Sequence, residues 1–253
     1  MFRLLLPILF GLFLEPMHQN ESPSPEDLLD SAIQAIGGEH AIQTLESFKL
    51  HGMIRLPDGR PVIEIDLATA IGGKVLAVQT FIGIGQTRFG SDGKTSWEQN
   101  PSADGTQIFT LIENKVLSQK VRQLNWVEWI TTLPLQLDQM EVIGETEFDQ
   151  EACWVLQINA ESVPKTTEKI FFSKSTNRIR GRQTIERTNE GDVMINIYFR
   201  DWNKVDDLYL FHAVVFDRNG VEVSMVFDTV KVNSVDERIF TLPDPVIALR
   251  DES

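Results

Sequence analysis

The spacing of apolar residues along the chain changes near residue 47. Upstream of this point, apolar residues recur at steps of three and four, which predicts one amphipathic helix. Ser24 is a suitable N-cap, Pro25 fits the first turn, and Gly37 with Gly38 ends the helix. The apolar face of this predicted helix consists of Leu28, Leu29, Ala32, Ile33 and Ile36.

Downstream, apolar and polar residues alternate in short runs, separated by turn residues such as Pro57-Asp58-Gly59. A period of two predicts strands, and turns this short favour antiparallel neighbours. Between Ile179 and Ile185, arginines alternate with uncharged residues, which predicts one charged and solvated face. The predicted strands are 48–56, 63–67, 74–82, 86–90, 95–97, 152–160, 169–173, 179–186, 193–199, 208–216 and 221–232.

Residues 112–131 interrupt the alternation. Their apolar residues return at steps of three and four, which predicts a second helix that ends before Leu133-Pro134. Together these elements predict a mainly β (α+β) fold. We expect one continuous, strongly curved antiparallel sheet of about 10–11 strands, with helices on its concave side.

The chain is predicted to hold one folded domain, residues 26–245. Residues 4–14 form an apolar run behind Arg3 that is shorter than the roughly 20 residues of a membrane span and fits a secretory signal. We therefore expect a signal peptide or short leader at 1–17, and a periplasmic or secreted protein; a start at Met17 is the alternative. A polar linker at 18–25 and a charged tail at 246–253 flank the domain.

Composition excludes several classes of function. With a net charge of −14 over 253 residues, the chain has no basic excess for binding nucleic acid. The single cysteine, Cys153, excludes an internal disulfide framework and a cysteine-rich zinc site. Since the four histidines are scattered, we expect no metal and no cofactor.

Several apparent motifs fail when their spacing is examined. The segment from Gly90 to Thr95 resembles a phosphate-binding loop, but Arg88 occupies the position of its first glycine, so a hairpin tip is favoured. Glu64 and Asp66 share the polar face of one predicted strand, which solvation explains. Because no nucleophile elbow is present either, we expect a protein that is not an enzyme.

Large aromatic residues are the remaining candidates for function. In one interpretation they are ordinary core; in the other they line an apolar cavity between the curved sheet and the helices. The candidate lining residues are Phe81, Phe89, Trp97, Trp126, Trp129, Trp154, Phe172 and Phe199.

Four segments, taken in order, resemble the outer-membrane lipoprotein-sorting family of LolA-like carriers, with LolB-like and RseB-like relatives. These segments are 35–38 with 45–48 and Gly52, then 91–97, 198–210 and 230–243, so the resemblance spans about residues 26–245. It implies a half-open β-barrel around helices that act as a lid. It also implies a carrier that shelters lipid or lipoprotein acyl chains.

Three hypotheses follow. The leading one is an exported, non-enzymatic protein that binds acyl chains or another hydrophobic ligand in a concave cavity. The second is a regulatory module on the same fold that senses or binds an envelope protein. The third is an enzyme that uses the cavity, which requires a buried carboxylate or histidine facing it.

Overall fold

The computed structural model describes residues 22–102, 104–112, 124–160, 166–188 and 191–252. The predicted leader and most of the predicted linker lie outside these residues, as does the part of the second predicted helix at 113–123. None of the described helices is long and apolar enough to cross a membrane.

The strands form a single antiparallel sheet in the order β6-β5-β4-β3-β2-β1-β13-β12-β11-β10-β9-β8-β7. Neighbours in the sheet are neighbours in sequence, except where β1 pairs with β13 and joins the two halves. The strands are β1 (Ser47–Arg55), β2 (Pro61–Ala70), β3 (Lys74–Phe81), β4 (Gly85–Asp92), β5 (Ser96–Pro101), β6 (Gln107–Leu111), β7 (Met140–Phe148), β8 (Glu151–Ala160), β9 (Thr166–Ser173), β10 (Ile179–Thr188), β11 (Gly191–Val205), β12 (Leu208–Arg218) and β13 (Val221–Val232).

The described helices are short. The side chain of Ser24 accepts the N–H of Asp27, so the predicted N-cap of α1 is confirmed. The carboxylate of Asp27 in turn accepts the N–H of Ser24, which completes a capping box. The helical segments are α1 (Pro25–Ile36), α2 (Glu39–Gln43), α4 (Trp126–Thr132), η1 (Leu133–Gln139), η2 (Glu237–Phe240) and α5 (Asp244–Asp251).

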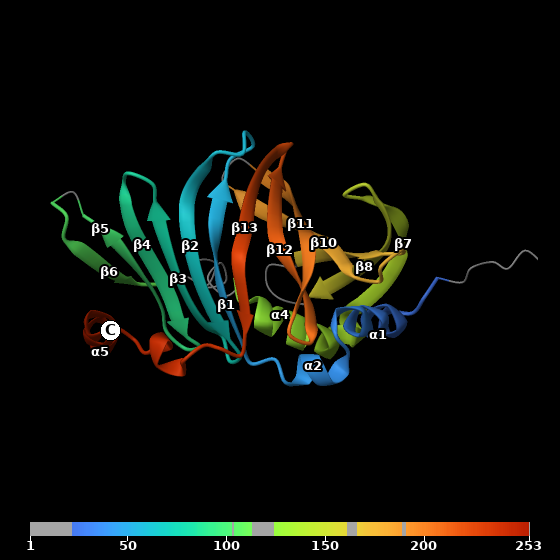
Figure 1. Cartoon of the computed structure of the whole chain (residues 1–253), viewed down its shortest axis with the longest axis horizontal. Coiled ribbons are helices and arrows are strands. Elements are labelled where there is room, and N and C mark those ends of the chain that lie inside the picture. The colour runs from blue at the N-terminus through green and yellow to red at the C-terminus, as the bar shows by residue number, and fades with distance from the viewer. Residues whose placement is uncertain (1–21, 103, 113–123, 161–165, 189–190, 253) are drawn as a thin grey trace, which may run out of the picture.

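The sheet is curved, and the helices α1, α2 and α4 gather near one end of its strands (Figure 1). Helix α1 contacts both β12 and β7, which lie five places apart in the strand order. One helix reaches both strands because the sheet bends around it. The predicted fold class, a curved and half-open antiparallel sheet, is therefore confirmed.

The sheet has thirteen described strands rather than ten or eleven. The two that the sequence analysis missed, β6 and β7, are the edges of the sheet. Edge strands bury less of their apolar face, so their alternation is weak: Ile108 and Ile143, for example, point into solvent. The α-helix expected up to residue 131 is observed from Trp126 to Thr132, and Asn125 is its N-cap.

The core fills the inner side of the sheet. The main cluster combines residues of α2 and α4 with residues of β1, β2, β11, β12 and β13, and a second cluster packs α1 against β8 and β9. In the opposite arm of the sheet, which ends in β5 and β6, α5 buries Val246 beside Trp97 and Leu242. Residues 246–251, expected as part of a charged tail, thus belong to this packed helix.

Candidate functional site

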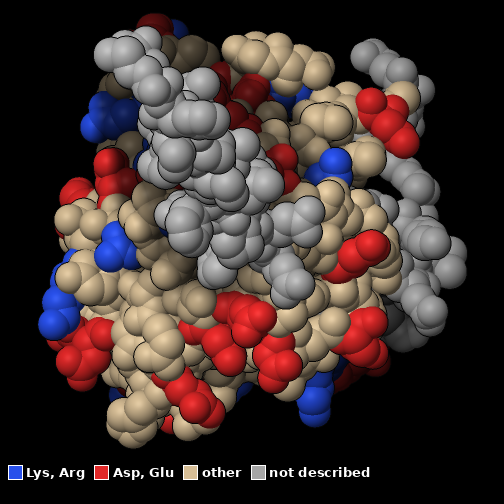
Figure 2. Space-filling model, turned by 90° about the vertical axis from the view of Figure 1, so that its right-hand side faces the viewer, with Lys and Arg blue, Asp and Glu red and all other residues tan. Residues whose placement is uncertain are grey.

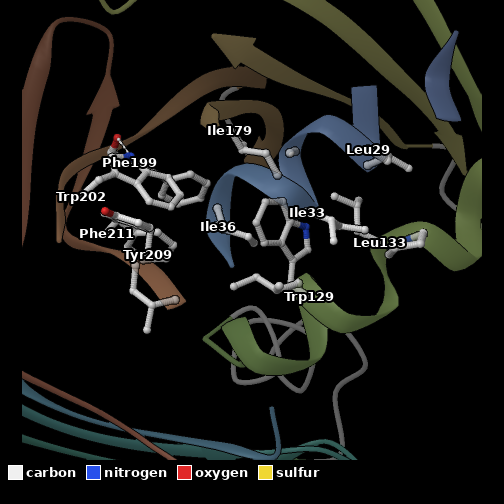
Figure 3. Close-up of a pocket in the computed structure, with 14 residues that line it drawn as sticks. Leu29, Ile33, Ile36, Trp129, Leu133, Ile179, Phe199, Trp202, Tyr209 and Phe211 are labelled. Carbon is white, nitrogen blue, oxygen red and sulfur yellow. Dashed lines mark hydrogen bonds between the residues drawn. The ribbon is translucent and has the colours of Figure 1, made fainter. Parts of the chain in front are cut away.

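An apolar cleft opens between α1, α4 with η1, and the strands β10, β11 and β12 (Figure 3). It contains about 540 Å³ of empty space, counting the part open to solvent, and the room between the side chains is narrow. The lining residues are Leu29, Ala32, Ile33, Ile36, Trp129, Ile130, Leu133, Pro134, Ile179, Phe199, Trp202, Tyr209, Leu210 and Phe211.

Helical periodicity supplies one wall of the cleft. Leu29, Ile33 and Ile36 follow each other at steps of four and three, so they share one face of α1. The other helical wall is fixed by Asn125, which is 2% exposed and donates from Nδ2 to the carbonyl of Ala70 at 2.8 Å. This contact ties the start of α4 to the end of β2.

Aromatic rings form the sheet side of the cleft. Phe199 and Phe211 stack with ring centroids 4.5 Å apart, and Trp202 meets Phe211 edge to face at 5.6 Å. The indole N–H of Trp202 donates to the carbonyl of Phe199, so its polar atom is paired. Trp129 approaches Phe199 from α4 at 5.7 Å. The rings thus present carbon to the cleft.

A bulge in β10 corrects the predicted charged face of that strand. The pairing with β9 shifts between Ile179 and Gly181. A Cβ on Gly181 would lie 2.8 Å from the ring of Phe148, which packs with Val155 and Phe171. These two residues alternate along β8 and β9 with the residues that pack under α1, so they lie on the outer face of the sheet and Gly181 faces outward. Arg182 consequently faces inward with Ile179, and its guanidinium lies 5.5 Å from the Trp129 ring and 3.1 Å from a carboxylate oxygen of Glu168.

Among the aromatic residues predicted from the sequence, Trp129 and Phe199 line the cleft. Trp126 is buried beside it and meets the ring of Phe211 at 5.1 Å. Phe172 and Trp154 pack in the second core cluster under α1. These residues share the half of the molecule that holds the cleft.

The remaining three lie in the other half. Trp97 packs with Leu242 and Val246 of the opposite arm, Phe89 borders the main cluster, and Phe81 ends β3. Whether any of the predicted residues contacts a ligand stays a prediction. Sequence reasoning did not select the α1 residues, or the rings of Trp202, Tyr209 and Phe211, as lining, although the helical spacing of the α1 residues was visible.

The described lining of the cleft includes no acid–base pair. Among the described residues that line it, Tyr209 is the one titratable side chain, and none is a carboxylate or a histidine. The enzyme hypothesis requires such a group facing the cavity. What the described lining provides is apolar contact.

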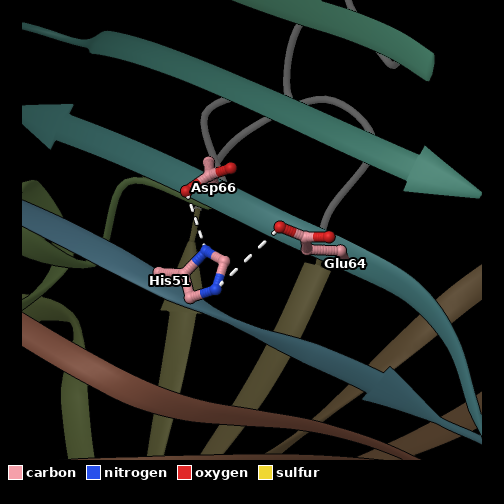
Figure 4. A group of neighbouring side chains, drawn as sticks. All are labelled: His51, Glu64 and Asp66. Carbon is pink, nitrogen blue, oxygen red and sulfur yellow. Dashed lines mark hydrogen bonds and ion pairs between the residues drawn. The ribbon is translucent and has the colours of Figure 1, made fainter.

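A separate polar group lies on β1 and β2 (Figure 4). His51 Nδ1 is 2.9 Å from Asp66 Oδ1, and Nε2 is 4.0 Å from oxygens of Glu64 and of Asp228. The hydrogen bond with Asp66, helped by the other two carboxylates, raises the pKa of His51. Ligand atoms of His51, Glu64 and Asp66 lie within 4.8 Å of one another, so a cation is chemically compatible with this exposed group. As it stands, the group is an ion-pair cluster that joins three strands.

The chain is similar in structure to several solved proteins. No family model and no curated protein matches its sequence. A DUF1329 family protein from Desulfovibrio piger has 11% identity and a TM-score of 0.58, with 87% of this chain and 98% of that chain covered. A LolA superfamily protein from Nitrosomonas europaea has 13% identity and a TM-score of 0.56, with 87% and 99% covered.

A third similar structure is an outer membrane lipoprotein-sorting protein domain from Vibrio parahaemolyticus, with 11% identity and a TM-score of 0.56. The match covers 84% of this chain and 95% of that domain. Identities this low speak for the fold alone. The chain has a LolA-like fold.

Proposed function

We propose that the protein binds a hydrophobic chain, such as the acyl chain of a lipid or lipoprotein, in the cleft between α1, α4 and β10–β12. The observation that carries this proposal is the composition of the lining, which is almost entirely aliphatic and aromatic carbon. An apolar concavity at the junction of helices and sheet is the usual setting of a small-molecule site.

The energetics favour such a role. Each buried CH₂ is worth about 0.8 kcal/mol, so an acyl chain of about 16 carbons gains on the order of 10 kcal/mol when it leaves water. The narrow room between the side chains means that a whole chain enters only when α1 or α4 moves outward. Both helices pack on the sheet through apolar contacts, and α4 is held in addition by the hydrogen bond from Asn125 Nδ2 to the carbonyl of Ala70.

The acidic surface agrees with a ligand held by its chain. On the side of the molecule where β7 and α1 lie in Figure 1, acidic side chains outnumber basic ones at the visible surface (Figure 2). With a net charge of −14, the protein is repelled as a whole by an anionic membrane. We therefore infer that the protein takes up single ligand molecules. We also infer export to the periplasm, which the fold and the predicted leader favour.

The test is displacement of a neutral apolar dye, N-phenyl-1-naphthylamine, by 1-hexadecanol. The wild type is expected to bind the dye saturably and to release it to hexadecanol. Ile33→Trp fills part of the cleft from α1, so the bound chain and the larger side chain would overpack the site. Because overpacking costs about 1–3 kcal/mol, hexadecanol should bind about tenfold more weakly. The matched control is Ile84→Trp in the β3–β4 turn, where the side chain is 85% exposed.

Failure of the wild type to bind the dye, or equal effects of the two substitutions, would contradict the proposal. The first result would favour the alternative function, recognition of a protein partner on the same fold.

A further inference from the structure

We propose that the ligand of the cleft is an amphiphile with an anionic head group, a carboxylate or a phosphate monoester, and that Arg178 binds this head group. The inference rests on the proposed function, because it places the head group at the rim of the cleft and the chain inside. It assigns a charged partner in a protein whose net charge is strongly negative.

The position of Arg178 in the chain places it at the rim of the cleft. It ends the turn between β9 and β10 and directly precedes Ile179, which lines the cleft. The backbone there is fixed, since the carbonyl of Arg178 accepts the N–H of Ser173 at 2.9 Å. The turn therefore delivers the arginine to the same place whenever β9 and β10 pair.

Two rings of the cleft hold the guanidinium. Its Cζ lies 4.4 Å from the centroid of Tyr209 and 5.7 Å from that of Trp202. Both rings line the cleft, and Figure 3 shows them on the side of Phe199 and Phe211. Tyr209 is 37% exposed, so this is a side of the cleft that meets solvent. Stacking on ring faces fixes the guanidinium plane and leaves its N–H edge for a ligand.

The charge of Arg178 has no counterion among the residues that the structure describes. Its Nε is buried without a hydrogen bond. The Nε atoms of Arg180 and Arg182 on β10 are buried without a hydrogen bond as well, but these two arginines have counterions: Arg180 pairs with Asp149, and Arg182 pairs with Glu168. A partly desolvated arginine whose guanidinium group has no carboxylate partner is suited to a planar carboxylate or to a phosphate. It can bind either group through two parallel N–H···O hydrogen bonds.

The adjoining apolar lining selects an amphiphile over a small anion. The protein's overall negative charge repels free anions, so a single arginine acts at short range, on a head group that the buried chain has already brought to the rim. The expected ligand class is a fatty acid or a monoacyl phosphate.

The experiment compares palmitate with 1-hexadecanol as displacers of the neutral dye at about pH 8, where the carboxyl group is ionised. A charge-assisted hydrogen-bonded pair should make palmitate effective at a concentration about tenfold lower than hexadecanol. In Arg178→Gln this preference should disappear, while the concentration of hexadecanol needed for displacement stays unchanged. Unchanged hexadecanol displacement also shows that the variant is folded.

Arg60→Gln is the matched control, because Arg60 lies in the exposed β1–β2 turn and pairs with Asp58. It should keep the full preference for palmitate. Equal displacement by palmitate and hexadecanol in the wild type would overturn the head-group assignment and leave the apolar site intact. So would a preference that survives in Arg178→Gln. If neither compound displaces the dye from the wild type, the proposed function itself fails.

Discussion

Asn125 makes the polar contacts that hold the start of α4 to the sheet, in addition to the apolar packing of the helix, and this leads to a sharp prediction. Its Oδ1 accepts the N–H of Glu128 at 3.1 Å and so caps the helix. Its Nδ2 donates to the carbonyl of Ala70 at 2.8 Å and to that of Lys74 at 3.3 Å. Since Asn125 is 2% exposed, water cannot replace these partners without a local rearrangement.

The magnitude follows from these contacts. Asn125→Ala removes an N-cap, worth about 1 kcal/mol, and the donor to a buried carbonyl, worth about 1–3 kcal/mol. The free energy of unfolding should fall by about 2–4 kcal/mol. Asn125→Ser keeps a capping hydroxyl but is too short to reach Ala70, so its loss should be about half as large.

Urea unfolding followed by circular dichroism and tryptophan fluorescence measures both losses. The control is Asn203→Ala, an exposed asparagine whose side chain donates to the carbonyl of Asp201. Its effect should stay within about 0.5 kcal/mol. The reasoning is refuted if Asn125→Ala costs no more than this control. A serine variant as stable as wild type would show that the ties to the sheet contribute nothing.

Three further predictions concern titration and packing. The pKa of His51 is raised in the folded protein, so the stabilisation by its ion pairs is complete below about pH 6.5 and is lost as the pH rises through the folded pKa. The thermal midpoint of unfolding should therefore fall over this pH range in the wild type and change less in His51→Gln. Burial raises the pKa of the Cys153 thiol to about 11, so a disulfide reagent at about pH 8 should react slowly with native protein and at once in urea; fast native reaction would contradict this. Gly181→Ala should destabilise the fold by about 1–3 kcal/mol in urea unfolding, because its Cβ would lie 2.1 Å from the carbonyl oxygen of Ile197; a neutral effect would refute the outward placement of Gly181.

The fold was largely predictable because alternation and turn chemistry are local. The hairpin tip at Ser91 to Thr95 illustrates this: Asp92 Oδ1 accepts the N–H groups of Lys94 and Thr95, as expected of a tight turn and not of a phosphate loop. The edge strands β6 and β7 escaped prediction because a strand paired on one side buries less apolar surface, and its sequence need not alternate.

The site was less predictable because it depends on how distant elements meet. Large aromatic residues do mark the core, but Trp97 and Trp129 look alike in sequence and lie in different clusters. The bulge at Arg180 reverses the face on which Arg182 lies, and a single inserted residue leaves no clear signal in a strand of alternating arginines. The rings of β11 and β12 join α1 only through the curvature of the sheet.

Contact quenching by a fatty acid brominated along its chain would locate the bound chain among the tryptophans. Trp129 and Trp202 line the cleft, whereas Trp97 packs against α5 in the opposite arm. We predict saturable quenching of the wild-type emission, strongly reduced in the Trp129→Phe, Trp202→Phe double variant and retained in Trp97→Phe. Quenching that persists in the double variant and is lost in Trp97→Phe, or no quenching at all, would contradict binding of an acyl chain in this cleft.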